Sequence, residues 1–290
     1  MSGIIYIYLL FFLLVINGCS SQPLQGGPDI PNTVIEIQHF AQSKHNKYAL
    51  ILEGHNSTYK IAGPNQGFDN DRLDRLSQPI KDPCIKRDVS ETSKLAISKG
   101  YDVYLVRNLE EFDQIAASLE LASDDATQLL IAMSGEGDDK GFIFNLVHIT
   151  DADGTPGPNF VPPGMKLTCN YFAKKLDQIH GTKAIVINAC QSGCFAEELR
   201  KDTQFQGVVI TACPIGYATT DCQKTQTSAI FAGFLGLYQD NPKEIRNLST
   251  AHITAGSWFE NFRHKFSDIG AGGLSISYDP VIYSTAEFLF

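Results

Sequence analysis

The sequence predicts a three-layer α/β sandwich, in which helices cover both faces of a mostly parallel, six-stranded sheet. Short and continuously apolar runs, such as residues 48–53 (YALILE) and 183–188 (KAIVIN), indicate strands that are buried on both faces. Helical patterns lie between these runs, and an alternating order of strands and helices favours parallel strands joined by crossovers.

The predicted elements follow one another without internal repeats. Strands are expected over residues 48–53, 101–107, 128–134, 183–188 and 207–213, and an edge strand within residues 273–283. Helices are expected over residues 86–99, 110–122, 166–179, 194–200, 224–237 and 250–266. Residues 151–165 hold four of the thirteen prolines of the chain, which predicts a long loop.

Composition excludes several classes of protein. The chain has 290 residues, a formal net charge of −9 at pH 7, 43% hydrophobic residues and 19% charged residues, which is a globular composition. Nucleic acid is not an expected partner, because proteins that bind it normally carry a basic face. Seven cysteines are too few for a disulfide scaffold, and their odd number leaves at least one thiol unpaired or modified.

The N-terminus predicts export. Residues 3–16 form an apolar run that is shorter than the ~20 residues of a membrane-spanning helix and matches the apolar core of a secretory signal. The run ends in Ile16-Asn17-Gly18-Cys19, which resembles a bacterial lipobox. We therefore expect residues 1–18 to be a lipoprotein signal peptide, with lipidation at Cys19. The alternative is ordinary cleavage near Ser20 or Ser21, with Cys19 incidental.

The expected lipid anchor defines the organisation of the rest of the chain. Residues 19–44 would comprise the lipidated cysteine and a flexible tether rich in Pro, Gly and Ser, and residues 45–290 a single domain. The anchor would make a membrane one partner of the protein. Ser20 after Cys19 favours an outer-membrane lipoprotein that faces the periplasm or the cell surface, and a secreted soluble protein is the alternative.

The expected site lies just beyond the strands, because ligands of open α/β sheets bind at the carboxyl ends of the strands. The segments there are Gly54-His55-Asn56, Gly135-Glu136-Gly137, Ala189-Cys190-Gln191-Ser192-Gly193 and Pro214-Ile215-Gly216. Each contains a glycine, which lets a backbone approach a ligand closely. No spacing of Cys and His fits a zinc site and no phosphate-binding loop occurs, so neither a metal nor a cofactor is expected.

Cys190 is the candidate nucleophile. It follows a buried strand directly and precedes small residues and a helix, so backbone N–H groups and the positive end of the helix favour its thiolate. The alternative interpretation is a buried structural cysteine.

Taken in order, these segments resemble the caspase–legumain superfamily of cysteine peptidases, over about residues 45–240. Residues 183–193 resemble its nucleophile segment, a strand followed by Ala-Cys-x-Ser-Gly, and residues 129–137 resemble its strand that ends in Ser-Gly-His-Gly. The resemblance implies a caspase-like sheet. It also implies that the backbone N–H groups of Cys190 and Gly137 form the oxyanion hole.

The resemblance extends to the surrounding residues. Asn56 matches the legumain branch, in which an asparagine after the first strand orients the catalytic histidine. Residues 207–218 resemble the strand and loop of the substrate pocket, which makes Thr211 and Ala212 candidate substrate-binding residues, together with His55. The implied partner is a peptide or protein substrate.

Glu136 stands where the family has its catalytic histidine. A neutral histidine takes the thiol proton and returns one to the leaving amine, whereas a glutamate with an ordinary pKa of ~4.3 is ionised at pH 7 and has no proton to give. A carboxylate beside a thiol also disfavours the thiolate by like-charge repulsion. Burial that raises the glutamate pKa would restore part of the acid function, and His55 is the alternative proton carrier, unless it is a solvated loop histidine.

We therefore expect an exported cysteine peptidase homologue with impaired hydrolysis of peptide bonds. The alternative is an inactive pseudo-peptidase that binds peptides or proteins, and a weaker one is a related acyl transferase. The spacing allows two disulfides, Cys190 with Cys194, which would block the nucleophile, and Cys213 with Cys222. Cys84 and Cys169 have no obvious partner in the sequence.

Overall fold

The computed structural model describes residues 46–61, 77–80, 82–151, 153–202, 204–219, 221–222, 227–228, 230–231, 270–271, 274–276 and 280–289. The expected signal peptide, Cys19 and the whole of the expected tether lie outside these residues. None of the described helices is both long enough and apolar enough to cross a membrane.

A six-stranded sheet forms the centre of the fold, with the strand order β18-β12-β11-β5-β1-β4. Its members are β1 (Lys47–Glu53), β4 (Asp102–Val106), β5 (Gln128–Ser134), β11 (Thr182–Asn188), β12 (Gly207–Thr211) and β18 (Val281–Ser284). All neighbours pair in parallel except β12 and the edge strand β18, which pair antiparallel. This is the mostly parallel, six-stranded sheet that the sequence predicted, so the predicted α/β fold class is confirmed.

The register brings the carboxyl ends of the central strands to one edge. Glu53 of β1 pairs with Ser134 of β5, and Ser134 pairs with Asn188 of β11. The chain therefore leaves β1, β5 and β11 at the same level, and the segments that follow them lie side by side.

Four helices cover the two faces of the sheet among the described residues. They are α3 (Pro83–Ser98), α4 (Leu109–Ala122), α5 (Cys169–Asp177) and α6 (Gly193–Lys201). Side-chain caps fix three of their starts: Asp82, Asn108 and Thr168 each accept from backbone N–H groups in the first turn of α3, α4 and α5. α6 begins without such a cap, directly after the turn that holds Cys190.

The core consists of two apolar layers, one on each face of the sheet. Tyr48, Leu50 and Leu52 of β1 pack with α4, α5 and α6, whereas Ala49 and Ile51 pack with α3. Burial on both faces explains why β1 reads as a continuous apolar run. Each fully buried Leu or Ile stabilises the fold by about 1.5–3 kcal/mol.

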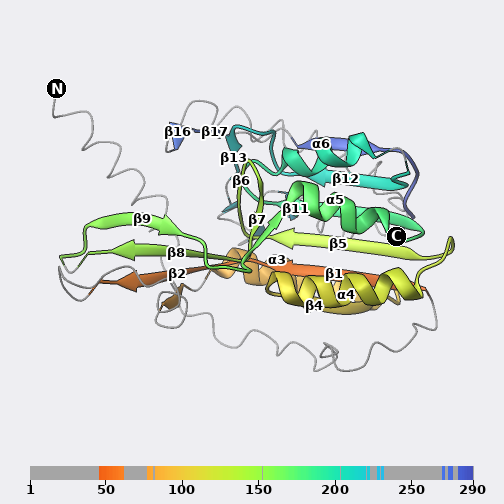
Figure 1. Cartoon of the computed structure of the whole chain (residues 1–290), viewed down its shortest axis with the longest axis horizontal. Coiled ribbons are helices and arrows are strands. Elements are labelled where there is room, and N and C mark those ends of the chain that lie inside the picture. The colour runs from red at the N-terminus through yellow and green to blue at the C-terminus, as the bar shows by residue number, and fades with distance from the viewer. Residues whose placement is uncertain are drawn as a thin grey trace.

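Two smaller sheets lie at the carboxyl edge, and the sequence did not predict either. The first has the order β3-β2-β8-β9 and consists of β3 (Gln78–Ile80), β2 (His55–Lys60), β8 (Asn145–Thr150) and β9 (Pro156–Phe160). The second has the order β10-β7-β6 and consists of β10 (Lys166–Thr168), β7 (Gly141–Ile143) and β6 (Glu136–Asp138). Figure 1 shows β2, β8 and β9 as a ribbon beyond the end of β1, while β6 and β7 stand beside β11.

The remaining described strands are short. They are β13 (Tyr217–Ala218), β14 (Asp221–Cys222), β15 (Thr227–Ser228), β16 (Gly270–Ala271) and β17 (Leu274–Ile276). The predicted helix over residues 224–237 lies mostly outside the described residues; Thr227 and Ser228 form β15 instead, whereas Ile230 and Phe231 are helical as predicted. The predicted helix over residues 250–266 lies wholly outside them.

Two predictions about the middle of the chain were wrong. Residues 151–165 are not one long loop, because β9 pairs antiparallel with β8. Its prolines are tolerated because it is the edge strand of its sheet. The helix predicted over residues 166–179 begins only at Cys169, since Lys166–Thr168 pair with β7 and Thr168 then caps α5.

Candidate active site

Two glycines allow the strand ends to approach each other. A Cβ atom on Gly54 would lie 2.7 Å from the Cα of Gly135, and the reverse distance is also 2.7 Å. The Gly54 N–H donates to the Ser134 carbonyl (2.8 Å), and the Gly135 N–H donates to the Asn188 carbonyl (3.0 Å). These two glycines were expected to accommodate a ligand, but they accommodate each other's backbone.

Cys190 lies in the tight turn between β11 and α6. Its residue is half-buried and its sulfur is a thiol. The next residue, Gln191, has a φ of 56°, a left-handed conformation that is uncommon outside glycine and is often found at functional sites. The Gln191 N–H donates to the Tyr217 carbonyl (2.8 Å) and the Gly193 N–H to the Cys213 carbonyl (2.9 Å). The segment after β12 therefore holds the turn in place.

Gly137 lies directly against the peptide of Cys190. A Cβ atom on Gly137 would be 2.5 Å from the Cys190 carbonyl oxygen and 2.9 Å from the Cβ of Ala189. Only glycine fits at this distance, because real Cβ atoms do not approach a carbonyl oxygen so closely. The structure thus brings together the two backbone segments that were expected to form the oxyanion hole.

Glu136 contacts Asn56, the residue expected to orient the catalytic position. The Asn56 Nδ2 group donates to Glu136 Oε1 at 3.1 Å. The asparagine thus presents its N–H group, and not its carbonyl, to the carboxyl oxygen. The Asn56 Oδ1 atom is buried and has no hydrogen-bond partner among the described residues.

His55 and Asn56 are neighbours in β2, so their side chains point to opposite faces of that strand. Since the Asn56 side chain reaches Glu136, alternation directs the His55 side chain away from Glu136. The register pairs His55 with the buried Asn145 of β8. This arrangement does not favour His55 as a substitute proton carrier.

The two predicted pocket residues are buried under the turn between β11 and α6 that holds Cys190 (the nucleophile turn), and they are not at its surface. Thr211 and Ala212 are buried, and the Ala212 N–H donates to the Ile187 carbonyl (2.9 Å) and to Ser192 Oγ (3.2 Å). Two exposed apolar side chains of the same predicted pocket segment lie nearby, Ile215 (37% exposed) and Tyr217 (40% exposed).

A buried carboxylate of α3 also supports this edge, and the sequence analysis missed it. Asp88 is fully buried; it accepts from Ser134 Oγ (2.7 Å) and from the Ser228 N–H (3.0 Å). It therefore links the end of β5, two residues before Glu136, to the later part of the chain. The available signal was its spacing, because Asp88 lies on the same helical face as Ile85, Val89 and Ala96.

The disulfide in the structure was not among those expected. Cys169 pairs with Cys194, with their Cα atoms 5.9 Å apart, a usual separation for a disulfide. Both expected pairings were wrong, because Cys194 is bonded to Cys169 and Cys213 is a buried thiol. Burial raises the pKa of the Cys213 thiol, which contacts the Tyr217 carbonyl at 3.2 Å. Cys190 therefore keeps its thiol. No group of three or more metal-ligating side chains occurs in the described part of the chain.

Comparison with solved structures finds caspases. The crystal structure of caspase-1 from Spodoptera frugiperda is 15% identical, with a TM-score of 0.49 over 92% of this chain and 96% of that one. A structure of pro-Sf-caspase-1 is 14% identical, with a TM-score of 0.43 over 85% of this chain and 94% of that one. No family model matches the sequence, and no curated protein matches it.

Proposed function

We propose that the chain is an exported caspase/legumain-like cysteine peptidase homologue with Cys190 in the nucleophile position. Its hydrolysis of peptide bonds is impaired because Glu136 replaces the catalytic histidine. The approach of Gly137 to the Cys190 peptide carries this proposal, since it brings the two backbone segments together next to a half-buried cysteine.

The chemistry has two steps. The Cys190 sulfur attacks the substrate carbonyl carbon, the oxyanion is held by the N–H groups of Cys190 and Gly137, and the C–N bond then breaks. The amine must gain a proton as it leaves, and water later releases the acyl group and restores the thiol. An ordinary carboxylate is a much weaker base than imidazole, so at neutral pH it rarely carries the proton that the leaving amine needs. Breakage of the amide bond is therefore the impaired step.

The second candidate is a pseudo-peptidase that binds a peptide or protein without turnover. Glu136 in the place of the histidine favours it, because an ordinary carboxylate is a poor general acid at neutral pH. The exposed side chains of Ile215 and Tyr217 beside the turn offer an apolar surface for such a ligand.

Two observations support the proposed export. The N-terminal sequence has the features of a lipoprotein leader, and disulfides such as Cys169–Cys194 persist in oxidising compartments. A lipid on Cys19 would make a membrane the second partner. Incorporation of an alkynyl fatty acid by the full chain, but not by its Cys19→Ala variant, tests this assignment, and equal incorporation by both would refute it.

The leaving group separates the two functions. An activated ester such as a peptidyl p-nitrophenyl ester releases p-nitrophenolate, an anion that needs no proton to leave. The wild-type protein should therefore be acylated at Cys190 by this ester but cleave the matching amide slowly. Glu136→His should raise amide hydrolysis by a factor on the order of 10²–10⁴, the usual contribution of general acid–base catalysis. Glu136→Gln, which has the same size but no proton to exchange, is the control and should give no increase.

Three outcomes discriminate the proposals. Amide cleavage by the wild-type protein as fast as by Glu136→His would exclude the pseudo-peptidase and the impairment. Ester acylation without wild-type amide cleavage would support the impaired peptidase. Absence of any Cys190 labelling, in the wild-type protein and in Glu136→His, would refute the peptidase homologue.

A further inference from the structure

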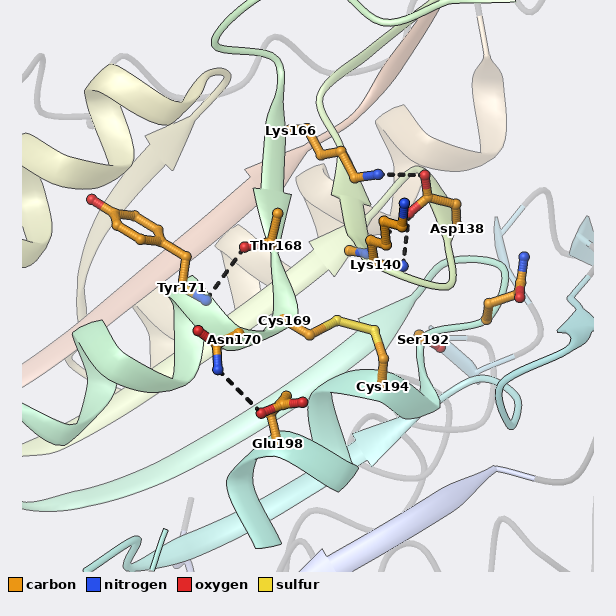
Figure 2. Close-up of a disulfide and its surroundings, with 12 residues drawn as sticks. Asp138, Lys140, Lys166, Thr168, Cys169, Asn170, Tyr171, Ser192, Cys194 and Glu198 are labelled. Carbon is orange, nitrogen blue, oxygen red and sulfur yellow. Dashed lines mark hydrogen bonds and ion pairs between the residues drawn. A yellow bond between two sulfur atoms is a disulfide. The ribbon is translucent and has the colours of Figure 1, made fainter. Parts of the chain in front are cut away.

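The Cys169–Cys194 disulfide joins the two segments that make the candidate site. It links the first turns of α5 and α6, two helices that lie on the same face of the sheet. Figure 2 shows the bridge between the two helices, with Asp138, Lys140 and Lys166 of the β6–β7–β10 sheet on one side and Ser192 on the other.

On the α5 side, the bond is anchored to the hairpin that carries Glu136 and Gly137. β6 pairs with β7, and β7 pairs with β10, which leads directly into Cys169. The Cys169 N–H donates to the Lys140 carbonyl (2.9 Å) at the tip of that hairpin. Asp138 accepts from the N–H groups of Lys140 (2.9 Å) and Gly141 (3.1 Å) and forms an ion pair with Lys166. Cys169 therefore moves with the hairpin.

On the α6 side, the bond is anchored to the nucleophile turn. The N–H groups of Cys194 and Phe195 donate to the Gln191 carbonyl (3.4 Å) and the Ser192 carbonyl (3.1 Å). Only three residues separate Cys194 from Cys190, and both lie in one hydrogen-bonded turn. The orientation of the Cys190 peptide is therefore coupled to the position of Cys194.

We propose that the Cys169–Cys194 disulfide is a positioning element, which holds the Gly137 backbone against the Cys190 peptide. It acts through both anchors, one on the hairpin and one on the turn between β11 and α6, and these two segments lie in close contact at Gly137. This inference rests on the proposed function, in which those two segments bind the oxyanion.

The bond is out of reach of mild reductants. Cys169 is 4% exposed and Cys194 is 5% exposed, whereas Cys190 is half-buried. Reduction by a dithiol transfers two electrons and two protons, gives two protein thiols and leaves the reductant as a cyclic disulfide. The attacking thiolate must reach a sulfur atom, so a monothiol that keeps Cys190 reduced should leave Cys169–Cys194 intact in the folded protein.

The test removes the covalent link and follows both segments. Cys169→Ala with Cys194→Ala cuts the link, and Cys169→Val with Cys194→Ala is a second pair that refills the apolar volume if the first folds poorly. Phe195→Leu is the matched control, because it weakens the same helix contact, the edge-to-face packing of Phe172 and Phe195 (centroids 5.3 Å apart), but keeps the bond.

Two measurements that need no turnover are made on the folded full chain. Hydrogen exchange should rise at least about 10-fold in residues 136–143 and 189–195 together when the link is cut, and not in β5. The rate of alkylation of Cys190 by iodoacetamide, read from its peptide by mass spectrometry, should change at least about 3-fold. The Phe195→Leu variant should leave both readouts within about 2-fold of the wild-type protein.

Other outcomes would overturn the proposal. Unchanged hydrogen exchange in residues 136–143 and 189–195 would do so, and so would a rise in exchange confined to α5 and α6. An equal rise in β5 would indicate that the bond only stabilises the fold. The proposed function fails by a different observation, namely a peptidyl ester that does not acylate Cys190 in the oxidised wild-type protein.

Discussion

Loss of the Cys169–Cys194 bond should destabilise the protein by an amount set by the length of chain that it closes. The two cysteines are 25 residues apart in the sequence. For a closed loop of that length the chain-entropy relation gives a change of about 12 cal/mol/K, or about 3.5 kcal/mol at 25 °C. Cys169→Ala with Cys194→Ala should therefore lower the free energy of unfolding by about 3.5 kcal/mol.

Urea unfolding at 25 °C, followed by circular dichroism without reductant, measures this change. The midpoint should fall while the slope of the transition changes little, because both proteins expose nearly the same surface when they unfold. Unfolding of the wild-type protein in the presence of a dithiol should reproduce the low midpoint of the variant. A loss below about 1 kcal/mol would refute the reasoning, since it would mean that the bond does not restrict the unfolded chain.

Three further substitutions probe the edge of the sheet and the core. Gly137→Ala should slow Cys190 acylation by a factor on the order of 10², because its Cβ would lie 2.5 Å from the Cys190 carbonyl oxygen and must displace it. Gly157→Ala, whose Cβ would lie 3.4 Å from Ile149, is the control. Equal acylation rates for the two variants would contradict the argument. Asp88→Ala leaves the Ser134 hydroxyl and the Ser228 N–H without this acceptor, so urea unfolding should show a loss of about 2–4 kcal/mol, and a neutral result would contradict it. Burial lowers the pKa of Lys183, so as the pH rises the folded protein loses the Lys183 proton before the unfolded chain does. The free energy of unfolding should therefore rise with pH up to the ordinary lysine value of 10.5. In Lys183→Met this rise should be absent, and identical pH profiles for the two proteins would contradict the lowered pKa.

The central sheet could be predicted from the sequence because burial on both faces leaves a direct mark. Residues 128–134 are almost all apolar, and β5 spans the same residues as the predicted strand. β2 and β9 leave no such mark, since β2 reads HNSTYK and β9 contains two prolines. Their pairing depends on where the chain goes after β1 and β8, which a local pattern does not encode.

The candidate site was likewise predictable from the sequence only in part. The sequence could place four residues together because each lies two or three positions after a predicted parallel strand, and parallel strands align their ends; they are Cys190, Glu136, Gly137 and Asn56. The disulfide could not be predicted, because Cys169 and Cys194 meet only through the packing of α5 on α6. Asp88 was missed because an aspartate in a helix is usually exposed, and its burial depends on partners from two distant segments.

The contact between Asn56 and Glu136 also explains why a histidine should still fit at position 136. Asn56 presents its N–H to the carboxylate and keeps its Oδ1 atom buried without a partner in the described structure. A half-turn of the amide exchanges the two groups, so that Oδ1 could accept from an imidazole N–H with no movement of β2. The gain in amide hydrolysis expected for Glu136→His should then depend on Asn56. Adding Asn56→Ala to Glu136→His should lower the rate of amide hydrolysis at least 10-fold, which is a part of the 10²–10⁴ effect of acid–base catalysis. In the protein that keeps Glu136, Asn56→Ala should leave the rate of ester acylation of Cys190 within a few-fold of the wild-type rate. Equal losses in the two backgrounds would mean that Asn56 only supports the fold.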